Sequence, residues 1–246
     1  MSNERQKPLA LVTGGASGMG RAIVERLARD GFAVMMVDRN EALAKQETAA
    51  LRGQGLEVDF SAIDITNEGA VNELIDASPP LAALINNAGI FDERAFDSVT
   101  AEDFRRMYEV NLIAVHLLTQ AAARKMRAGA KVVIIASRAY LGARNHAHYV
   151  ASKAAVVGYA RTAAMELAPR GILVNAIAPG LIDTPMLRAL SPERRKAQEA
   201  LQPTGKAGRP EDIANAVSFL ASPTMDFVTG QLLFVDGGKS LGGSLA

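Results

Sequence analysis

The sequence predicts an α/β protein in which a doubly wound parallel β-sheet carries helices on both faces. Three features lead to this prediction: apolar runs recur along the chain, segments with helical spacing separate them, and a glycine-rich turn follows the first run. Strands that are buried on both faces of a parallel sheet read as continuous apolar runs. Because no linker and no internal repeat interrupts the alternation, we expect residues 1–246 to form one domain.

The apolar runs and the segments between them give the expected elements in order. Strands are expected at LALVT (9–13), AVMMVD (33–38), LAALINNAG (81–89), KVVIIAS (131–137), ILVNAIAPG (172–180) and QLLFVDGG (231–238). Helical spacing predicts a helix after the glycine turn and further helices at 41–52, 67–77, 102–127, 150–168 and 210–221. This β–α order is typical of a parallel sheet.

The segment 181–208 departs from this alternation. It is amphipathic, charged and bounded by prolines, and it follows the end of an expected strand. Ligands bind such sheets in the crevice beyond the carboxyl ends of the strands, so we expect this segment to form a substrate lid. An ordinary helical hairpin on the surface is the alternative.

Composition excludes several classes of function. The 27 Lys and Arg residues balance 26 Asp and Glu residues, so we expect neither nucleic acid nor a membrane surface as a partner. The chain has no cysteine, which excludes disulfides, thiolate metal sites and cysteine nucleophiles. The N-terminal stretch MSNERQKP lacks the apolar core of a signal peptide, and no apolar run approaches the roughly 18 residues of a membrane span. A cytoplasmic protein is expected.

The glycine-rich turn TGGASGMG is the first candidate binding element. Gly14, Gly18 and Gly20 lie where an apolar strand gives way to a helix, and such a turn can offer unpaired N–H groups and the positive end of the helix dipole to a phosphate. The spacing G-x-x-x-G-x-G differs from the commoner G-x-G-x-x-G, and Gly15 lies outside it. Glycines that serve only a tight β-to-α connection are the alternative.

The aspartate that ends the second expected strand bears on the choice of cofactor. Asp38 lies 18 positions after Gly20, near the roughly 20 residues expected for a carboxylate that accepts hydrogen bonds from the adenosine ribose. A 2′-phosphate would meet a like charge there, so NAD is expected over NADP. Arg39 weakens this inference because a guanidinium could pair with that phosphate. Ser17 favours NAD, because it occupies a turn position where a basic side chain would help to bind the 2′-phosphate. A turn or helix-capping role for Asp38 is the alternative.

Tyr149 and Lys153, in the segment YVASK, lie one helical turn apart, and Ser137 ends a buried strand upstream. A phenol with a pKa of about 10 is a poor base at neutral pH. A neighbouring ammonium and an oxidised nicotinamide ring would both lower that pKa, so Tyr149 could exchange a proton with an alcohol or ketone. Ser137 would hydrogen-bond the same oxygen, and Lys153 would reach the nicotinamide ribose. A surface pair without chemistry is the alternative for the tyrosine and lysine.

Taken together, these motifs resemble those of the short-chain dehydrogenase/reductase family over essentially the whole chain, which implies a Rossmann-like fold. The matching segments are TGGASGMG (13–20), NNAG (86–89), the serine with Y-x-x-x-K, PGLIDT (179–184) and GQLLFVDGG (230–238). The resemblance implies that Asn111, in EVNL, holds a water and extends a proton relay from the lysine. It also implies a homotetramer built through the helices that carry Asn111 and Tyr149.

The resemblance completes the expected cofactor site. Asp64 and Ile65 should flank the adenine, Asn87 and Gly89 the nearer ribose region, and the main chain at Ile182 with Thr184 the carboxamide. The full expected set is Gly14, Ser17, Gly18, Met19, Gly20, Asp38, Arg39, Asp64, Ile65, Asn87, Ala88, Gly89, Tyr149, Lys153, Pro179, Gly180, Ile182 and Thr184.

The expected substrate site lies between the serine and the tyrosine, with contributions from the lid. Its candidates are Phe91, Ser137, Arg138, Ala139, Tyr140, Arg144, His146, His148, Met186 and Leu187. The arginines could bind an anionic group of the substrate, although solvated loop charge is the more usual explanation. The two histidines have no further histidine or thiolate nearby, so no metal is expected.

The sequence therefore predicts an NAD-dependent oxidoreductase that interconverts a small-molecule secondary alcohol and ketone, with the tyrosine as general acid and base. Two alternatives stay open. An NADPH-dependent 3-oxoacyl carrier-protein reductase is disfavoured by Asp38, and a non-catalytic nicotinamide-binding sensor would be expected to have lost one of Ser137, Tyr149 or Lys153. Substrate, stereochemistry and direction do not follow from the sequence.

Overall fold

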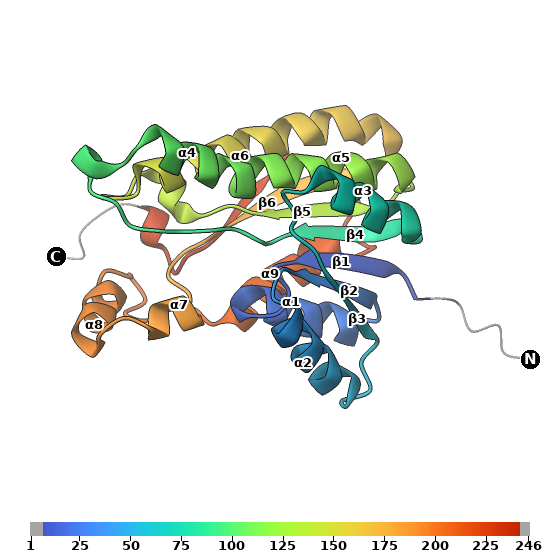
Figure 1. Cartoon of the computed structure of the whole chain (residues 1–246), viewed down its shortest axis with the longest axis horizontal. Helices are drawn as coiled ribbons and strands as arrows, with labels where there is room; N and C mark the ends of the chain where they lie inside the picture. The colour runs from blue at the N-terminus through green and yellow to red at the C-terminus, as the bar shows by residue number, and fades with distance from the viewer. Residues whose placement is uncertain (1–6, 242–246) are drawn as a thin grey trace, which may run out of the picture.

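The computed structural model describes residues 7–241. A seven-stranded parallel sheet forms the central layer of the molecule (Figure 1). The strand order is β3-β2-β1-β4-β5-β6-β7. The strands are β1 (Leu9–Thr13), β2 (Ala33–Asp38), β3 (Val58–Ala62), β4 (Leu81–Asn86), β5 (Lys131–Ile135), β6 (Leu173–Pro179) and β7 (Leu232–Val235). The predicted doubly wound parallel sheet is thereby confirmed.

Helices form a layer on each face of the sheet, with α3 to α6 on one side and α1, α2 and α9 on the other (Figure 1). Their bounds are α1 (Gly18–Arg29), α2 (Glu41–Arg52), α3 (Glu68–Ala77), α4 (Ala101–Tyr108), α5 (Ala114–Lys125), α6 (Ala147–Leu167), α7 (Pro185–Arg188), α8 (Pro192–Ala200) and α9 (Pro210–Ala221). No helix between residues 7 and 241 is long and apolar enough to cross a membrane.

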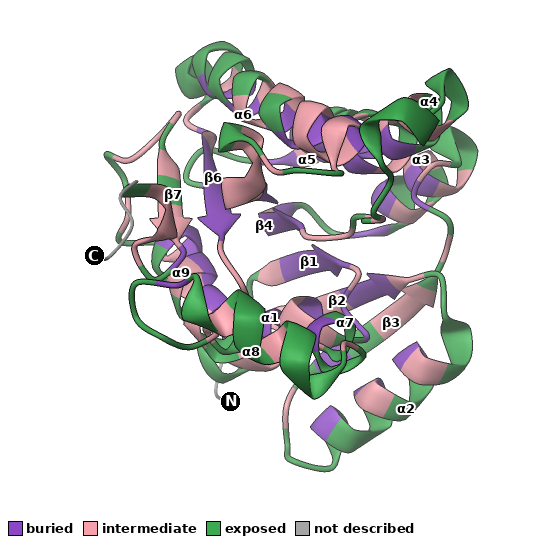
Figure 2. Cartoon of the chain, turned by 90° about the vertical axis from the view of Figure 1, so that its left-hand side faces the viewer, coloured by how far each residue is buried: buried purple, intermediate pink, exposed green. Residues whose placement is uncertain are grey.

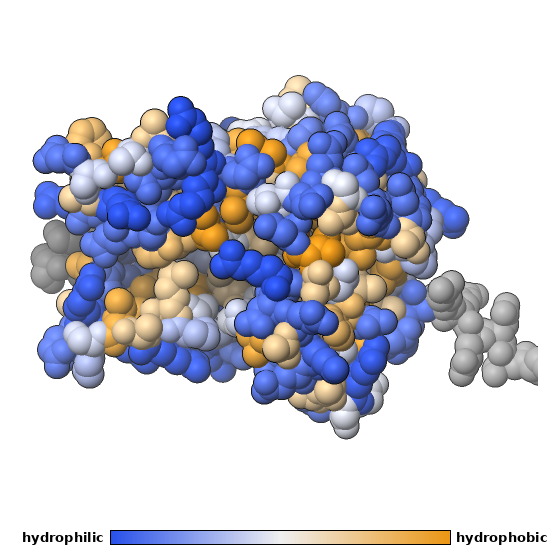
Figure 3. Space-filling model, in the orientation of Figure 1, coloured by the Kyte–Doolittle hydropathy of each residue, from blue (hydrophilic) through white to orange (hydrophobic). Residues whose placement is uncertain are grey.

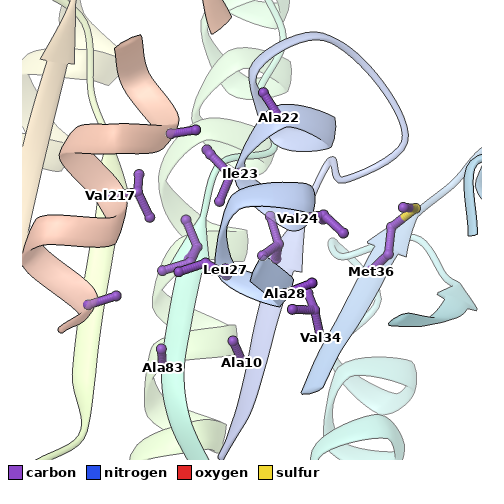
Figure 4. Packing of buried hydrophobic residues seen from close by; sticks show 14 of the residues in the cluster. Ala10, Ala22, Ile23, Val24, Leu27, Ala28, Val34, Met36, Ala83 and Val217 are labelled. Carbon is purple, nitrogen blue, oxygen red and sulfur yellow. The ribbon is translucent and has the colours of Figure 1, made fainter. Parts of the chain in front are cut away.

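The core consists of two apolar clusters, one on each face of the sheet. Successive side chains of a strand point to opposite faces, so Ala10 and Val12 of β1 belong to one cluster and Leu11 to the other. Figure 4 shows the first cluster, where Leu27 of α1 and Val217 of α9 pack over the central strands. This burial on both faces is why the strands read as continuous apolar runs.

The sequence missed one strand and one interruption of a helix. Strand β3, VDFSA, lies at the sheet edge and pairs only with β2, so its outer residues are polar and partly exposed. The single helix predicted for 102–127 is divided into α4 and α5 by a π-helical turn at Glu109–Ile113. The expected lid, 181–208, contains the short helices α7 and α8, which lie beyond the carboxyl ends of the strands (Figure 1).

Candidate active site

A cleft of about 740 Å³ opens beyond the carboxyl ends of the central strands. The chain leaves β1 toward β2 and later returns to place β4 on the other side of β1, and open α/β sheets bind ligands where the strand order reverses in this way. Figure 3 shows the hollow between the helix layer that contains α4 and the segment that contains α7. The glycine turn, the ends of β2 and β4, helix α4 and residues 184–186 line the cleft.

Steric constraint at the glycine turn explains its spacing. Gly14 and Gly18 adopt positive φ angles of 62° and 52°, which side chains rarely accept. A Cβ on Gly20 would lie 1.9 Å from the carbonyl oxygen of Gly14, a distance that no packing change can relieve. Within residues 7–241 no side chain caps the first turn of α1, so its N–H groups are available to an anion at the cleft.

Gly15 serves a different purpose from its three neighbours. A Cβ there would lie 2.6 Å from Cγ of Met36, and the Gly15 amide donates to the carbonyl oxygen of Val37 at 3.2 Å. This glycine therefore packs the turn onto β2 rather than toward the cleft. Its position outside the phosphate-binding spacing has a structural reason that the sequence did not show.

A network between β1 and β4 holds the turn in place. The side-chain amide of Asn87 donates to the carbonyl oxygens of Thr13 (2.9 Å) and Gly14 (3.2 Å). The Thr13 hydroxyl accepts from the amides of Asn87 and Ala88, both at 3.0 Å. The Oδ1 atom of Asn87 is buried without a hydrogen-bond partner in the described chain, so the lining of the cleft retains an unused acceptor. Sequence analysis did not single out Thr13.

Asp38 contacts the turn and also lines the cleft. One carboxylate oxygen accepts from the amide of Ala16 at 3.1 Å and the other from the amide of Asn40 at 3.0 Å. Asp38 therefore has the structural role in the turn that the alternative interpretation gave it. It also lines the cleft in which the cofactor is expected. Arg39 lies in the same wall.

The wall beyond β3 carries a second carboxylate. Hydrogen bonds from the backbone and hydroxyl of Thr66 hold the pKa of Asp64 below its usual range, and the charge of Arg39 adds to this effect. Asp64 and its neighbour Ile65 line the cleft as expected.

The structure brings most of the expected cofactor residues to the cleft. Those that line it are Gly14, Ser17, Gly18, Met19, Gly20, Asp38, Arg39, Asp64, Ile65, Asn87, Ala88, Gly89 and Thr184. Gly180 packs elsewhere, since a Cβ there would lie 2.7 Å from the Cα of Asp236. Ile182 is buried in the cluster beneath α1 and α9, with its main chain bridged to Gly208. Lining residues that sequence analysis missed are Val37, Ile63, Thr66, Ile90, Glu102, Arg105, Arg106, Glu109, Val110 and Pro185.

Helix α6 carries the tyrosine and the lysine behind the lining of this cleft. Neither is among the lining residues of the described chain, but Gly89, which lines the cleft, borders Lys153 Nζ. Burial raises the pKa of Tyr149, and a hydrogen bond with the Ser137 side chain acts in the opposite direction. Burial lowers the pKa of Lys153 to about 8, and its Nζ donates to the carbonyl oxygen of Ile135 at 2.8 Å. The lowered phenol pKa expected for catalysis is thus not produced by the protein groups alone.

Ser137 is held in a defined orientation beside the phenol. It caps the 3₁₀ turn Arg138–Leu141, and its hydroxyl oxygen accepts from the amide of Ala139 at 3.1 Å. Because that lone pair is occupied by a backbone donor, the hydroxyl hydrogen can point toward Tyr149 or a substrate oxygen.

The π-helical turn places Asn111 against the same space. Its Oδ1 accepts from the amide of Ile90 at 2.8 Å, and its Nδ2 donates to the carbonyl oxygen of Ile90 and to the Ser152 hydroxyl, both at 3.1 Å. A Cβ on Gly89 would lie 3.0 Å from Asn111 Oδ1 and 3.4 Å from Lys153 Nζ, so both polar groups border this glycine. Single π-helical turns occur frequently at functional sites. A water relay through Asn111 stays a prediction.

The expected substrate residues divide into two groups. Phe91 packs edge-on against Tyr149, His146 stacks on Phe91, and Met186 lines the cleft. Two further candidates have buried side chains, since His148 binds the carboxylate of Asp92 and Leu187 is 4% exposed. Contact of either with a substrate stays a prediction. Arg144 lies exposed on its loop, so contact with an anionic substrate stays a prediction.

Tyr140 and Arg138 occupy the turn that follows Ser137. The ring of Tyr140 lies 6.0 Å from that of Phe234 at the end of β7, and Arg138 is half-buried. Among the described residues no three His, Asp or Glu side chains are grouped so that they could hold a metal ion.

The family model described as enoyl-(acyl carrier protein) reductase matches residues 14–240. Cyclopentanol dehydrogenase of Comamonas testosteroni is 40% identical over 239 residues, covering 94% of this chain and 96% of its own. The 3-oxoacyl-acyl-carrier-protein reductase FabG of Aquifex aeolicus is 34% identical, covering 97% and 99%.

A solved structure adds a bound dinucleotide. The blue fluorescent protein from a metagenomic library in complex with NADPH has a TM-score of 0.88 and 33% identity, and the match covers 95% of this chain and 98% of that one. The chain belongs to the short-chain dehydrogenase/reductase family and is an oxidoreductase of that family.

Proposed function

We propose that this protein is an NAD-dependent oxidoreductase that interconverts a small-molecule secondary alcohol and its ketone, with Tyr149 as general acid and base. The observation that carries the proposal is the half-buried phenol of Tyr149, which has the Ser137 side chain beside it and lies one helical turn from Lys153, whose Nζ borders Gly89 in the lining of the cleft. In the direction of alcohol oxidation, Tyr149 would accept the proton of the alcohol oxygen, and a bound nicotinamide would supply the hydride acceptor.

The cleft fits a nicotinamide dinucleotide on three structural grounds. The first turn of α1 is uncapped within the described chain, a Cβ is excluded at Gly20, and Asn87 Oδ1 is buried without a partner there. The glycine turn would hold the pyrophosphate, Asp38 the adenosine ribose, and Asp64 with Ile65 the adenine side. When bound, the nicotinamide supplies the hydride acceptor or donor.

The residues around the phenol would control proton transfer between Tyr149 and the substrate oxygen. Burial opposes ionisation of Tyr149, so the positive charges beside the phenol must stabilise the phenolate if it is to act as a base near neutral pH. Lys153 supplies one such charge below its pKa of about 8. Ser137 donates to the substrate oxygen and stabilises charge that develops there. Asn111 would hold a water that connects Lys153 with solvent.

The preference for NAD rests on one carboxylate. Asp38 would face a 2′-phosphate across a partly buried wall, and Ser17 offers no positive charge to that phosphate. Arg39 is the opposing feature, and the FabG relative keeps an NADPH-dependent 3-oxoacyl carrier-protein reductase as the second candidate. Comparing kcat/KM for NAD and NADP with one active alcohol separates the two.

The proposal also includes assembly as a homotetramer through the helices that carry Asn111 and Tyr149. Ile113, in the π-helical turn, and Met165, on α6, are exposed apolar residues on these helices, at 40% and 78%. Multi-angle light scattering tests it, and a mass equal to one chain would contradict it.

The decisive experiment is a screen of alcohols and ketones with NAD or NADH, followed by Tyr149→Phe on the best substrate. The relatives named for cyclopentanol and for cis-4-hydroxycyclohexanecarboxylate justify ring alcohols in that screen. We expect Tyr149→Phe to lower kcat by about 10²–10⁴-fold while NADH binding is retained, because only the proton carrier is lost. If the wild type binds NADH but reduces no ketone, the sensor alternative replaces the proposal.

A further inference from the structure

Two adjacent residues after β4 contact two adjacent residues at the start of α6. Phe91 lies edge-on to Tyr149, with ring centroids 5.0 Å apart and an interplanar angle of 90°. Its neighbour Asp92 accepts a hydrogen bond from Nε2 of His148, which precedes Tyr149. The loop and the helix that carries the phenol are therefore joined at two consecutive positions.

Asp92 ties this loop to both neighbouring helices. His148 is fully buried, and the Asp92 carboxylate also binds the guanidinium of Arg106 on α4. The hydrogen bond from His148 and then the contact with Arg106 hold the pKa of Asp92 below its usual range. A backbone hydrogen bond of 2.8 Å from Arg94 to Asn145 adds a further tie. Phe91 consequently stands on a loop whose orientation is fixed.

Phe91 itself is covered on one side and open on another. His146 stacks on it with centroids 4.9 Å apart and an interplanar angle of 24°, yet 40% of Phe91 remains exposed. An apolar ring that is rigidly held and exposed at a reacting group is suited to contact a substrate.

We propose that Phe91 determines specificity by forming a rigid aromatic wall that selects alcohols and ketones whose reacting carbon lies in an alicyclic ring. This inference rests on the proposed function. A compact ring meets a flat wall without loss of internal rotation, whereas a flexible chain must be ordered to make the same contact. Phe96, on the same loop but 79% exposed, makes no aromatic contact within the described chain and provides a matched control.

The test compares two alcohols with six carbons each, cyclohexanol and hexan-2-ol, using NAD and the full-length protein. We expect the wild type to prefer the ring in kcat/KM, and Phe91→Leu to reduce that preference by about three- to tenfold, mainly through KM for cyclohexanol. Phe96→Leu should leave the preference unchanged. A preference that Phe91→Leu does not alter, or that is absent from the wild type, overturns the inference and leaves the proposed oxidoreduction intact.

A binding measurement separates the inference from the function on which it rests. Calorimetric titration of the NADH-loaded protein with cyclohexanone and with hexan-2-one reports wall contact without turnover. If cyclohexanone binds more tightly than hexan-2-one to the wild type and this difference is lost in Phe91→Leu, the aromatic wall is supported. Absence of reduction of both ketones would overturn only the proposed function. Equal weakening of both ketones by Phe91→Leu, or no binding of either, overturns the wall.

Discussion

The two sides of the cleft are held by different kinds of contact. On the cofactor side, the turn after β1 is fixed by backbone geometry and by buried hydrogen bonds from Asn87 and Thr13. On the substrate side, α8 contacts the loop after β4 through an ion pair of 3.3 Å between Arg194 and Glu93, whose side chains are 63% and 49% exposed. Figure 2 shows that α8 is mostly exposed, whereas β6 in the sheet is buried except at its first residue.

This difference shows which side of the cleft can vary. A glycine that excludes any Cβ has no substitute, whereas exposed ion pairs contribute little to stability and can be exchanged at small cost. We therefore expect the cofactor side to tolerate fewer substitutions than the substrate side.

The largest effect is expected for Gly20→Ala on the cofactor side. We expect NADH affinity to fall by about 100-fold, the upper range of an overpacking cost, because the new Cβ would meet the Gly14 carbonyl oxygen. Gly158→Ala in α6 is the control, since a Cβ there meets nothing within 4 Å, and it should stabilise the protein by about 0.5–1 kcal/mol. Fluorescence titration with NADH measures the first effect, and unchanged affinity would refute the steric account.

Burial of Lys153 predicts a pH dependence of stability. Its pKa is about 8 in the folded protein and about 10.4 in the unfolded chain, so between these values the unfolded state binds more protons. Stability should therefore rise from pH 8 to pH 10, by up to about 3 kcal/mol from this group. Urea unfolding of wild type and Lys153→Met at several pH values isolates the contribution. An identical pH profile for the two proteins would argue against a buried ammonium.

Asp38→Asn tests the electrostatic part of the cofactor side. The amide keeps an oxygen for the Ala16 N–H and removes the charge, so the ratio of kcat/KM for NADP to that for NAD should rise by about tenfold. Asp59→Asn, on the exposed edge strand, is the control. A wild type that already prefers NADP would show that Arg39 outweighs the carboxylate.

The smallest effect is expected on the substrate side. Arg194→Gln breaks the exposed pair with Glu93, and we expect KM for the alcohol to change by about twofold or less while the NAD affinity stays constant. Arg127→Gln, exposed beyond the opposite ends of the strands, should change neither. A tenfold change in KM would mean that this pair controls access to the site.

The sequence predicts the elements of the cofactor side better than those of the substrate side. The buried strands, the glycine turn and the YVASK helix could be predicted because each imposes a residue pattern that few other structures require. Strand β3 could not, since an edge strand with Asp59 and Ser61 lacks the apolar run of a buried strand. Local periodicity also gives no sign of the π-helical turn around Asn111.

The contacts on the substrate side could not be predicted from the sequence, because they form only in the folded chain. His146 and His148 are two residues apart, and no sequence pattern distinguishes them. In the structure His146 stacks on Phe91, whereas His148 is buried against Asp92. Both contacts join segments more than 50 residues apart, so no local pattern records them. Likewise, Arg106 reaches the cleft only because α4 packs beside it.

The central claim is that Tyr149 becomes a usable base only when positive charge lies beside it. Ultraviolet difference titration of wild type against Tyr149→Phe, with and without saturating NAD, measures the pKa of this phenol directly. We expect a pKa above the ordinary value for the protein alone and a pKa close to neutral with NAD bound. A phenol pKa that does not move when NAD binds would contradict it.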